Sequence, residues 1–138
     1  MGFSAAVIGS FRRHYAEVVA VVRELEEAGF EVRSPVVSRI INPGAAYVRF
    51  ETDLPQLSNL DIQAATLAKI LDSDVVYLVA PGGYVGRTTC YELGCVQERG
   101  IPVYFSEVPE DLPIAIPLEN VCAPGELMRR VQTREVGA

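Results

Sequence analysis

The stretch Asp74-Val-Val-Tyr-Leu-Val-Ala80, followed directly by Pro81-Gly-Gly-Tyr-Val-Gly-Arg87, decides the fold of this chain. Its first half is apolar at successive positions, as in a central strand of a parallel sheet that is buried on both faces. Its second half holds glycines and a proline, which end the strand in a tight loop. A helix is expected directly after the loop, from Thr89 to about Arg99, with Gly100 as its stop signal.

The same strand, loop and helix order recurs along the rest of the chain. Residues 3–9 predict a buried first strand that ends at Gly9, and residues 14–28 predict an amphipathic helix with apolar positions at i, i+3, i+4 and i+7. Further strands are expected at 30–33, 101–105 and 113–116, and further helices at 61–71 and 126–134. A short helix over 45–50 is compatible with the long connection at 36–59.

Strands that alternate with helices predict an α/β fold. We expect a doubly wound, flavodoxin-like parallel sheet of about five strands in the order 2-1-3-4-5, with helices on both faces. The length of 138 residues suits one domain that spans the whole chain.

Composition narrows the classes of partner and location. A net charge of −6 disfavours nucleic acid and anionic membranes as partners. No apolar run reaches the roughly 20 residues of a membrane helix, and the N-terminus lacks the pattern of a signal peptide, so a cytoplasmic location is expected. Three cysteines without CxxC spacing and a single histidine predict no metal site, and no cofactor is expected.

The topology predicts where a ligand binds. In doubly wound sheets, ligands lie beyond the carboxyl ends of the strands where the strand order reverses, here between the first and third strands. The first loop at this point begins with Gly9, which permits a sharp turn, and Ser10, whose hydroxyl can donate a hydrogen bond. The free N–H groups of the following helix suit an anion, and Arg12 or Arg13 can supply a second contact. Alternatively, Ser10 is the N-cap of an ordinary strand-to-helix turn.

The second loop at this edge carries Gly82, Gly83 and Gly86, which allow the backbone to approach a ligand closely. It does not match the dinucleotide-binding fingerprint, because Pro81 stands where that fingerprint needs a glycine. The lysine of a phosphate-binding P-loop is absent as well. A phosphoacceptor receiver domain needs an aspartate at the end of the third strand, where this chain has Ala80.

Glu92 is the sharpest candidate for chemistry. We expect it in the first turn of the helix after the glycine loop, where the helix N-terminus would keep its carboxylate ionised and fit to act as a nucleophile. The alternative is a capping box formed by Thr89-Cys-Tyr-Glu92, in which Glu92 only accepts a hydrogen bond from the amide of Thr89. His14 is more typical of a helix start than of a catalytic base. Tyr84 and Tyr47 can stack on a base or cover the core.

Two segments resemble a known family. Gly9-Ser10-Phe11-Arg12 resembles the Gly-Ser-x-Arg loop of the nucleoside 2-deoxyribosyltransferase superfamily, which includes the 2'-deoxynucleoside 5'-monophosphate N-glycosidases. Ser73-Asp74-Val-Val, the glycine loop and then Tyr91-Glu92-Leu93-Gly94 are similar to the second signature of this family, whose last glutamate is the nucleophile. The order and spacing agree over about residues 5–105.

The resemblance implies hydrolysis or transfer at the N-glycosidic bond of a nucleoside or nucleoside 5'-monophosphate. It implies that Glu92 attacks the anomeric carbon and that water or a second base resolves the glycosyl-enzyme. It also implies a homodimer, or a larger oligomer, in which a partner chain completes the pocket. The substrate and its 5'-phosphate or 5'-hydroxyl would be held by the two loops, namely by Gly9, Ser10, Phe11, Arg12, Gly82, Gly83, Tyr84, Gly86, Arg87 and Thr88.

Two positions depart from the pattern of the family. Ala6 stands where the first strand commonly carries a tyrosine, and Thr66 stands near the place of an aspartate that helps to protonate the leaving base. Asp53, in the long connection, can supply that acid if the connection folds over the site. If no acid is present, the alternative function is a non-catalytic nucleotide-binding or sensing module of the same fold.

Overall fold

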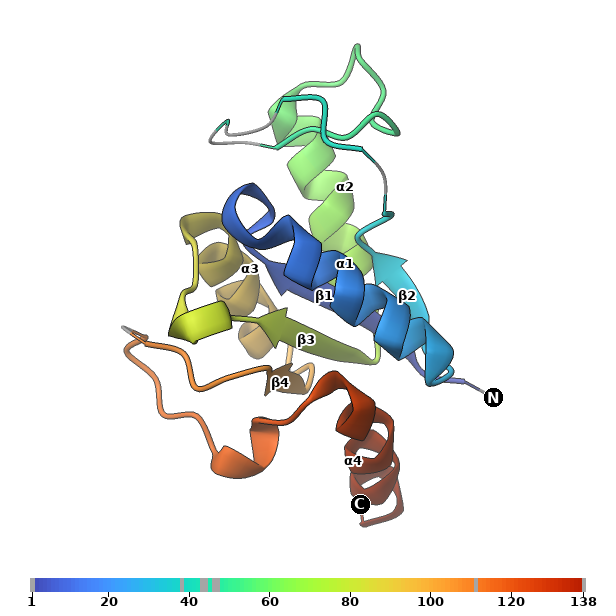
Figure 1. Ribbon diagram of the computed structural model, residues 1–138, viewed down its shortest axis with the longest axis vertical. Coiled ribbons are helices and arrows are strands. Elements are labelled where there is room, and N and C mark those ends of the chain that lie inside the picture. The colour runs from blue at the N-terminus through green and yellow to red at the C-terminus, as the bar shows by residue number, and fades with distance from the viewer. Residues whose placement is uncertain (1, 38, 43–44, 46–47, 111, 138) are drawn as a thin grey trace.

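The computed structural model describes residues 2–37, 39–42, 45, 48–110 and 112–137 (Figure 1). Two short 3₁₀ helices, η1 (Pro81–Gly83) and η2 (Leu118–Asn120), occur beside the longer elements. In chain order, the strands and α-helices are β1 (Ser4–Gly9), α1 (Phe11–Glu27), β2 (Glu31–Ser34), α2 (Asn59–Leu71), β3 (Val75–Val79), α3 (Arg87–Glu98), β4 (Val103–Phe105) and α4 (Pro124–Gly137).

The sheet is parallel and has the order β2-β1-β3-β4, which confirms the predicted doubly wound α/β fold. The described residues form four strands rather than about five. The expected strand at 113–116 does not form, and Val121 instead makes a single parallel bridge to Phe105. Pro113 cannot donate to a ladder and the segment is largely exposed, so little favours a regular strand there.

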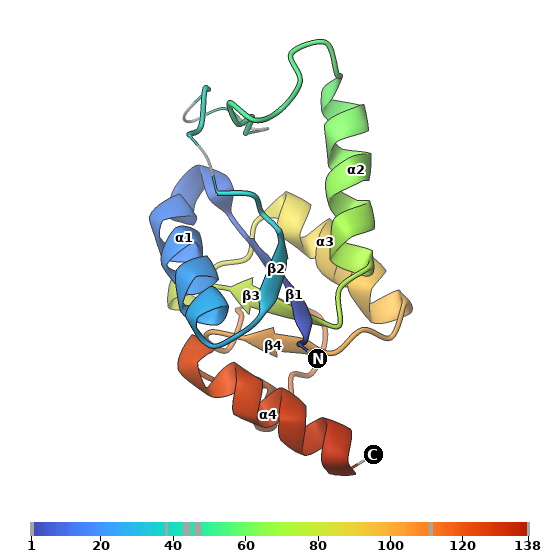
Figure 2. The same ribbon diagram turned by 90° about the vertical axis from the view of Figure 1, so that its right-hand side faces the viewer.

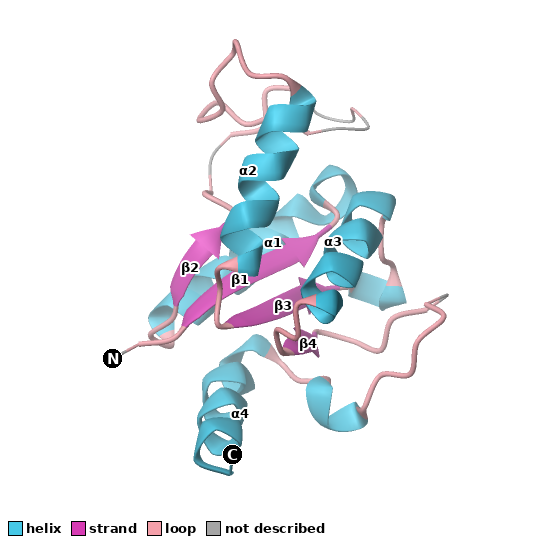
Figure 3. Cartoon of the chain, turned by 180° about the vertical axis from the view of Figure 1, so that it is seen from behind, coloured by secondary structure: helices cyan, strands magenta, loops and turns pink. Residues whose placement is uncertain are grey.

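Helices cover both faces of the sheet, as predicted (Figures 2 and 3). On one face, Val7 and Tyr77 of the sheet pack with buried residues of α1 and with Leu127 of α4. On the other face, Ile8 and Leu78 pack with Ile70 of α2 and with buried residues of α3. The strands β1 and β3 are therefore buried on both sides, which explains their continuous apolar runs.

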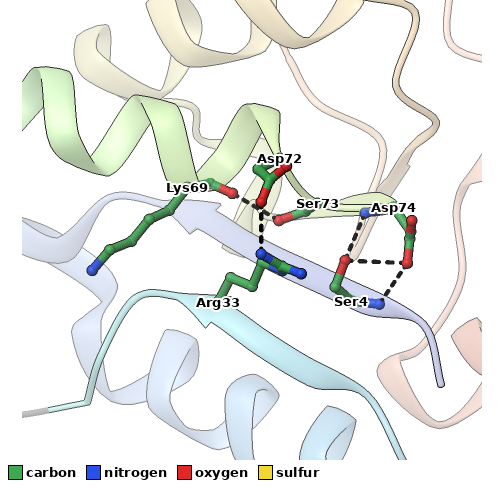
Figure 4. Close-up of polar contacts among 6 residues, drawn as sticks. All are labelled: Ser4, Arg33, Lys69, Asp72, Ser73 and Asp74. Carbon is green, nitrogen blue, oxygen red and sulfur yellow. Dashed lines mark hydrogen bonds and ion pairs between the residues drawn. The ribbon is translucent and has the colours of Figure 1, made fainter.

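Polar contacts fix the register of β1 and β3 at their amino ends (Figure 4). The Asp74 carboxylate accepts hydrogen bonds from the N–H of Ser4 at 2.8 Å and from its hydroxyl at 3.1 Å, and the N–H of Asp74 donates to Ser4 Oγ at 3.0 Å. Arg33 of β2 donates to the Asp72 carboxylate at 2.7 Å. Ser73-Asp74 is part of the stretch that resembles the second signature of the family. In the structure, Asp74 joins the amino ends of β1 and β3 through its hydrogen bonds to Ser4.

All four α-helices begin earlier than predicted, because residues typical of helix starts lie upstream of the apolar pattern. Helix α1 begins directly after Ser10, whose Oγ accepts the N–H of Arg13 at 3.2 Å, and it departs from helical geometry at His14. Helix α2 begins after Ser58, which forms a capping box with Asp61. Helix α4 begins at its proline. The expected helix over 45–50 lies partly outside the described residues, and positions 45 and 48–50 are not helical.

Candidate functional site

A cleft of about 520 Å³ opens beside the carboxyl ends of β1 and β3, where the order of the strands reverses. Its volume lies within the range of small-molecule sites. The turn after β1, the start of α3, one face of α2 and the connection before α2 all contribute to its lining. The cleft therefore occupies the place that the topology predicts for a ligand.

Most of the predicted site residues line this one cleft, although they come from three separate parts of the chain. The lining includes Gly9, Ser10, Phe11, Arg12, Asp53, Tyr84, Gly86, Arg87, Thr88 and Glu92. The lining residues that the sequence did not single out for binding are Val48, Phe50, Ile62, Gln63, Thr66 and Thr89. Five of these belong to α2 or to the long connection, whose approach to the cleft depends on tertiary contacts.

Gly82 and Gly83 lie outside the cleft lining and shape the turn after β3. Gly82 has a φ of +64° and donates its N–H to the Glu107 carboxylate at 3.1 Å. Gly83 has a φ of +83°, and a Cβ there would lie 2.7 Å from the side chain of Glu110. Gly83 therefore permits the close approach of residues 108–110, whereas Gly82, with no atom within 4 Å of its Cβ position, serves the positive φ of the turn.

Glu92 lies in the second turn of α3, not in the first. The helix begins at Arg87 with Gly86 as its N-cap, whose carbonyl accepts the N–H of Cys90 at 2.9 Å. The alternative interpretation, a capping box of Glu92 with Thr89, is therefore not formed by these described residues. No hydrogen bond or ion pair from the described residues reaches the partly buried Glu92 carboxylate.

Burial raises the pKa of Glu92 to about 7. The prediction that the helix N-terminus keeps this carboxylate ionised is therefore wrong, because the side chain begins a full turn beyond the uncapped amides and desolvation dominates. At neutral pH the ionised and protonated forms of Glu92 coexist. A carboxyl group with such a pKa is suited to chemistry that needs either form near pH 7.

Cationic and polar groups of two helix starts line the same cleft. Ser10 is the N-cap of α1, as the alternative interpretation predicted. Its Oγ accepts the N–H of Arg13, and this bond does not use the hydroxyl proton of Ser10. No side chain caps α3 at Gly86. Arg12 and Arg87 are exposed and have no ion-pair partner among the described residues. Two helix N-termini with unpaired arginines suit a phosphate group.

Aromatic and aliphatic side chains form another part of the lining. The ring of Phe50 lies 5.5 Å from that of Phe11 and 5.4 Å from that of Tyr15, and the Phe11 and Tyr15 rings lie 5.9 Å apart. Val48 and Ile62 add aliphatic surface to the lining. A planar nucleobase suits such a surface.

Tyr84 lines the cleft from the glycine loop and is held by α1. The Arg13 guanidinium lies 4.2 Å from the centre of the Tyr84 ring, and the His14 ring lies 5.8 Å from it. His14 does not line the cleft, so its contacts favour the helix-start interpretation over that of a catalytic base. Tyr47 lies outside the described residues.

A more open hollow of about 910 Å³ lies at the opposite, amino-terminal edge of the sheet. It is lined by Glu31 and Arg33 of β2, by residues of α2 and by Arg99 after α3. The Arg33–Asp72 ion pair occupies part of its wall. Ligand sites of doubly wound sheets lie at the carboxyl edge, so the smaller cleft is the stronger candidate.

None of the described helices combines the length and the apolar character needed to cross a bilayer. Comparison of the chain with protein-family models, with curated proteins and with solved structures found no match. The fold and the cleft geometry are therefore the observations on which a function is proposed.

Proposed function

We propose that this protein cleaves or transfers the N-glycosidic bond of a nucleoside or nucleoside 5'-monophosphate, with Glu92 as the nucleophile. The observation that carries the proposal is the position of Glu92 in the same cleft as Arg12 and Arg87. Among the described residues, Glu92 has no hydrogen-bond partner and neither arginine has an ion-pair partner. The two arginines favour the 5'-monophosphate over the free nucleoside. The resemblance to the nucleoside 2-deoxyribosyltransferase superfamily supports the same chemistry.

The chemistry takes place in two displacements. An oxygen of the ionised Glu92 carboxylate forms a bond to the anomeric carbon, and the electron pair of the broken C–N bond leaves with the base, which takes up a proton. Water, or a second nucleobase, then attacks the anomeric carbon, and the bond from this carbon to the Glu92 carboxylate breaks. The attacking group loses a proton to a nearby proton acceptor. Two displacements on the same carbon retain its configuration.

A second carboxyl group is available to supply the proton that the departing base needs. Asp53 lines the cleft, as expected if the long connection folds over the site. Thr66 lines it as well, but a threonine hydroxyl is a poor acid at neutral pH. We therefore assign the role of general acid to Asp53.

The alternative function is a non-catalytic nucleotide-binding or sensing module. The observation that favours it is Thr66, which lines the cleft near the position where the family has an acid. Such a module would keep the phosphate-binding groups and bind the nucleotide without turnover. A ligand at a hundred times its dissociation constant would then stabilise the fold by about 2.7 kcal/mol.

We propose a second copy of this chain as the partner, with the cytoplasm as the location. Support for a homodimer comes from α2, which carries apolar residues at i, i+4, i+7 and i+8 on a face turned away from its buried residues Ile62 and Ile70. Leu60 on that face is 75% exposed. The face consists of Leu60, Ala64, Leu67 and Ala68, which we call the outer face of α2.

The test is base release from a panel of ribo- and deoxyribonucleoside 5'-monophosphates beside the matching nucleosides. We expect release from at least one monophosphate and much slower release from its nucleoside. Thermal stabilisation by one nucleotide without any release would support the binding module instead. If no member of the panel shows release or stabilisation, both proposals are overturned.

A further inference from the structure

The loop at residues 49–57 is closed by a single side chain. One guanidinium nitrogen of Arg49, Nη2, donates to the carbonyl of Leu57 at 2.8 Å and to that of Leu54 at 3.2 Å. The N–H of Arg49 also donates to Asn42 Oδ1 at 2.6 Å. Arg49 thereby ties the start of this loop to its end and fastens it to the chain that precedes it.

A tight turn inside this loop orients Asp53. The N–H of Phe50 donates to Asp53 Oδ2 at 2.8 Å, and the N–H of Asp53 donates to the carbonyl of Phe50 at 3.0 Å. The Phe50 ring packs against Phe11 and Tyr15 of α1, so the turn is anchored to the rigid part of the fold. No hydrogen bond from the described residues occupies the other carboxylate oxygen of Asp53, Oδ1.

We propose that Arg49 is a positioning residue that holds Asp53 in the cleft as the proton donor to the leaving base. This inference rests on the proposed function, because it assigns a role within that reaction. Arg49 itself does not line the cleft, so it acts only through the loop. The planar guanidinium holds two carbonyls in a fixed geometry, whereas the ammonium of a lysine is a point charge on a flexible stem.

The proton that Asp53 supplies is needed only by some leaving groups. When an ordinary purine departs, it keeps the electron pair of the C–N bond and takes the proton of the Asp53 carboxyl group. A purine methylated at N7 already carries a positive charge, so the same electron pair leaves it neutral without any proton. A loss of acid catalysis therefore slows the first substrate and spares the second.

The experiment compares three variants on the best purine 5'-monophosphate of the panel and on its N7-methyl derivative. Arg49→Lys loosens the loop, and Asp53→Asn removes the acid but keeps an oxygen that can accept the Phe50 N–H. Arg39→Lys is the matched control, because Arg39 lies in the same long connection before α2. Its side chain pairs with the exposed Glu51 at 3.5 Å and does not line the cleft. Circular dichroism and thermal melts check that each variant is folded.

On the unmethylated substrate, we expect Asp53→Asn to lower kcat by about 100-fold, as general acid catalysis implies. We expect Arg49→Lys to lower kcat by about 10-fold with little change in KM, because a small misplacement of a catalytic group is costly. On the methylated substrate, both variants should remain within about twofold of the wild type, and Arg39→Lys should match the wild type on both substrates.

Equal losses on the two substrates in Arg49→Lys would show a merely structural role and overturn the assignment, as would no loss on either. A wild type that releases the methylated base but not the unmethylated one would overturn the acid role of Asp53 while the proposed nucleophile stands. A wild type that releases neither base would overturn the proposed function itself, and this assignment with it.

Discussion

Burial, rather than the helix start, decides the properties of Glu92. The sequence predicted that Glu92 lies in the helix after the glycine loop. It also predicted an ionised carboxylate, because Thr89 was expected to begin α3. The helix begins at Arg87 instead, which moves Glu92 into the second turn, where burial raises its pKa to about 7. Such a shift depends on tertiary packing around the carboxylate and could not be read from local spacing.

The raised pKa predicts the pH dependence of the reaction. If ionised Glu92 is the nucleophile, base release should increase as the pH rises through about 7 and level off above it, since more of the carboxylate is then ionised. A rate that instead falls through this range, in Asp53→Asn as well as in the wild type, would assign Glu92 the role of an acid. The measurement is kcat/KM for the best monophosphate between pH 5 and 9, beside the matching nucleoside, which carries no phosphate that titrates near pH 6.

The same pKa predicts a gain of stability in Glu92→Gln. The pKa of Glu92 is about 7 in the folded protein against an unperturbed 4.5, so the folded state binds the proton more tightly than the unfolded state does. The free energy of unfolding therefore falls as the pH rises from about 4.5 through 7, and the neutral amide removes this loss. We expect Glu92→Gln to be about 2–3 kcal/mol more stable than the wild type at pH 8, and about equal to it at pH 4.

Urea unfolding at the two pH values measures this difference. Glu98→Gln is the matched control, because Glu98 lies on the same helix but is exposed. A gain at pH 8 that is the same in both variants would contradict the account of Glu92.

At the scale of elements, the turn from β1 into α1 depends on a close approach that only glycine allows. A Cβ at Gly9 would lie 3.0 Å from the carbonyl oxygen of Val79 and 3.3 Å from a methyl group of Val18. Gly9→Ala should therefore destabilise the fold by about 1–3 kcal/mol, as overpacking does. The same change at Gly94, inside α3 with no atom within 4 Å of its Cβ position, should be neutral or stabilising by up to about 1 kcal/mol.

Thermal or urea unfolding of the two alanine variants measures this contrast. A Gly9→Ala protein as stable as the wild type would show that the strand ends can separate at no cost. A strong loss in Gly94→Ala would show that the helix interior is less tolerant than its open surroundings indicate.

The predictions of elements succeeded where local pattern and buried structure agree. The apolar run of β3 and the periodicity of α1 gave their elements to within a few residues. The fifth strand failed, because an apolar segment between prolines lies exposed beside η2. The connection before α2 could not be predicted, since its pairing of Ile41 with Arg49 and of Glu51 with Arg39, each at 2.9 Å, joins residues without a periodic pattern.

For the molecule as a whole, the strand order alone predicts the position of the cleft. The reversal of strand order between β1 and β3 selected the two glycine-bearing loops, and one wall of the cleft follows from that choice. The other wall, from α2 and from the loop that carries Asp53, follows from how the long connection packs against Phe11 and Tyr15. The sequence therefore predicted the position of the cleft better than the full set of groups that line it.

The outer face of α2 makes the predicted dimer testable. Ala68→Glu places a charge on this face and should shift the protein from dimer to monomer, since a buried unpaired charge is costly. Ala65→Glu is the matched control, because it makes the same change on a different, exposed side of the same helix. Sedimentation equilibrium measures the mass of each. A monomeric wild type, or a dimer that tolerates both changes, would contradict this use of α2.

The central claim is that Glu92 performs the displacement, and the most direct test is base release by Glu92→Gln beside the wild type at pH 8, with the best monophosphate of the panel. At this pH most of the wild-type carboxylate is ionised, because its pKa is about 7. We predict a loss of kcat of about 10³-fold or more in the variant, with the nucleotide still bound, as expected for the removal of a nucleophile. A variant that retains base release within about tenfold of the wild type would contradict the claim.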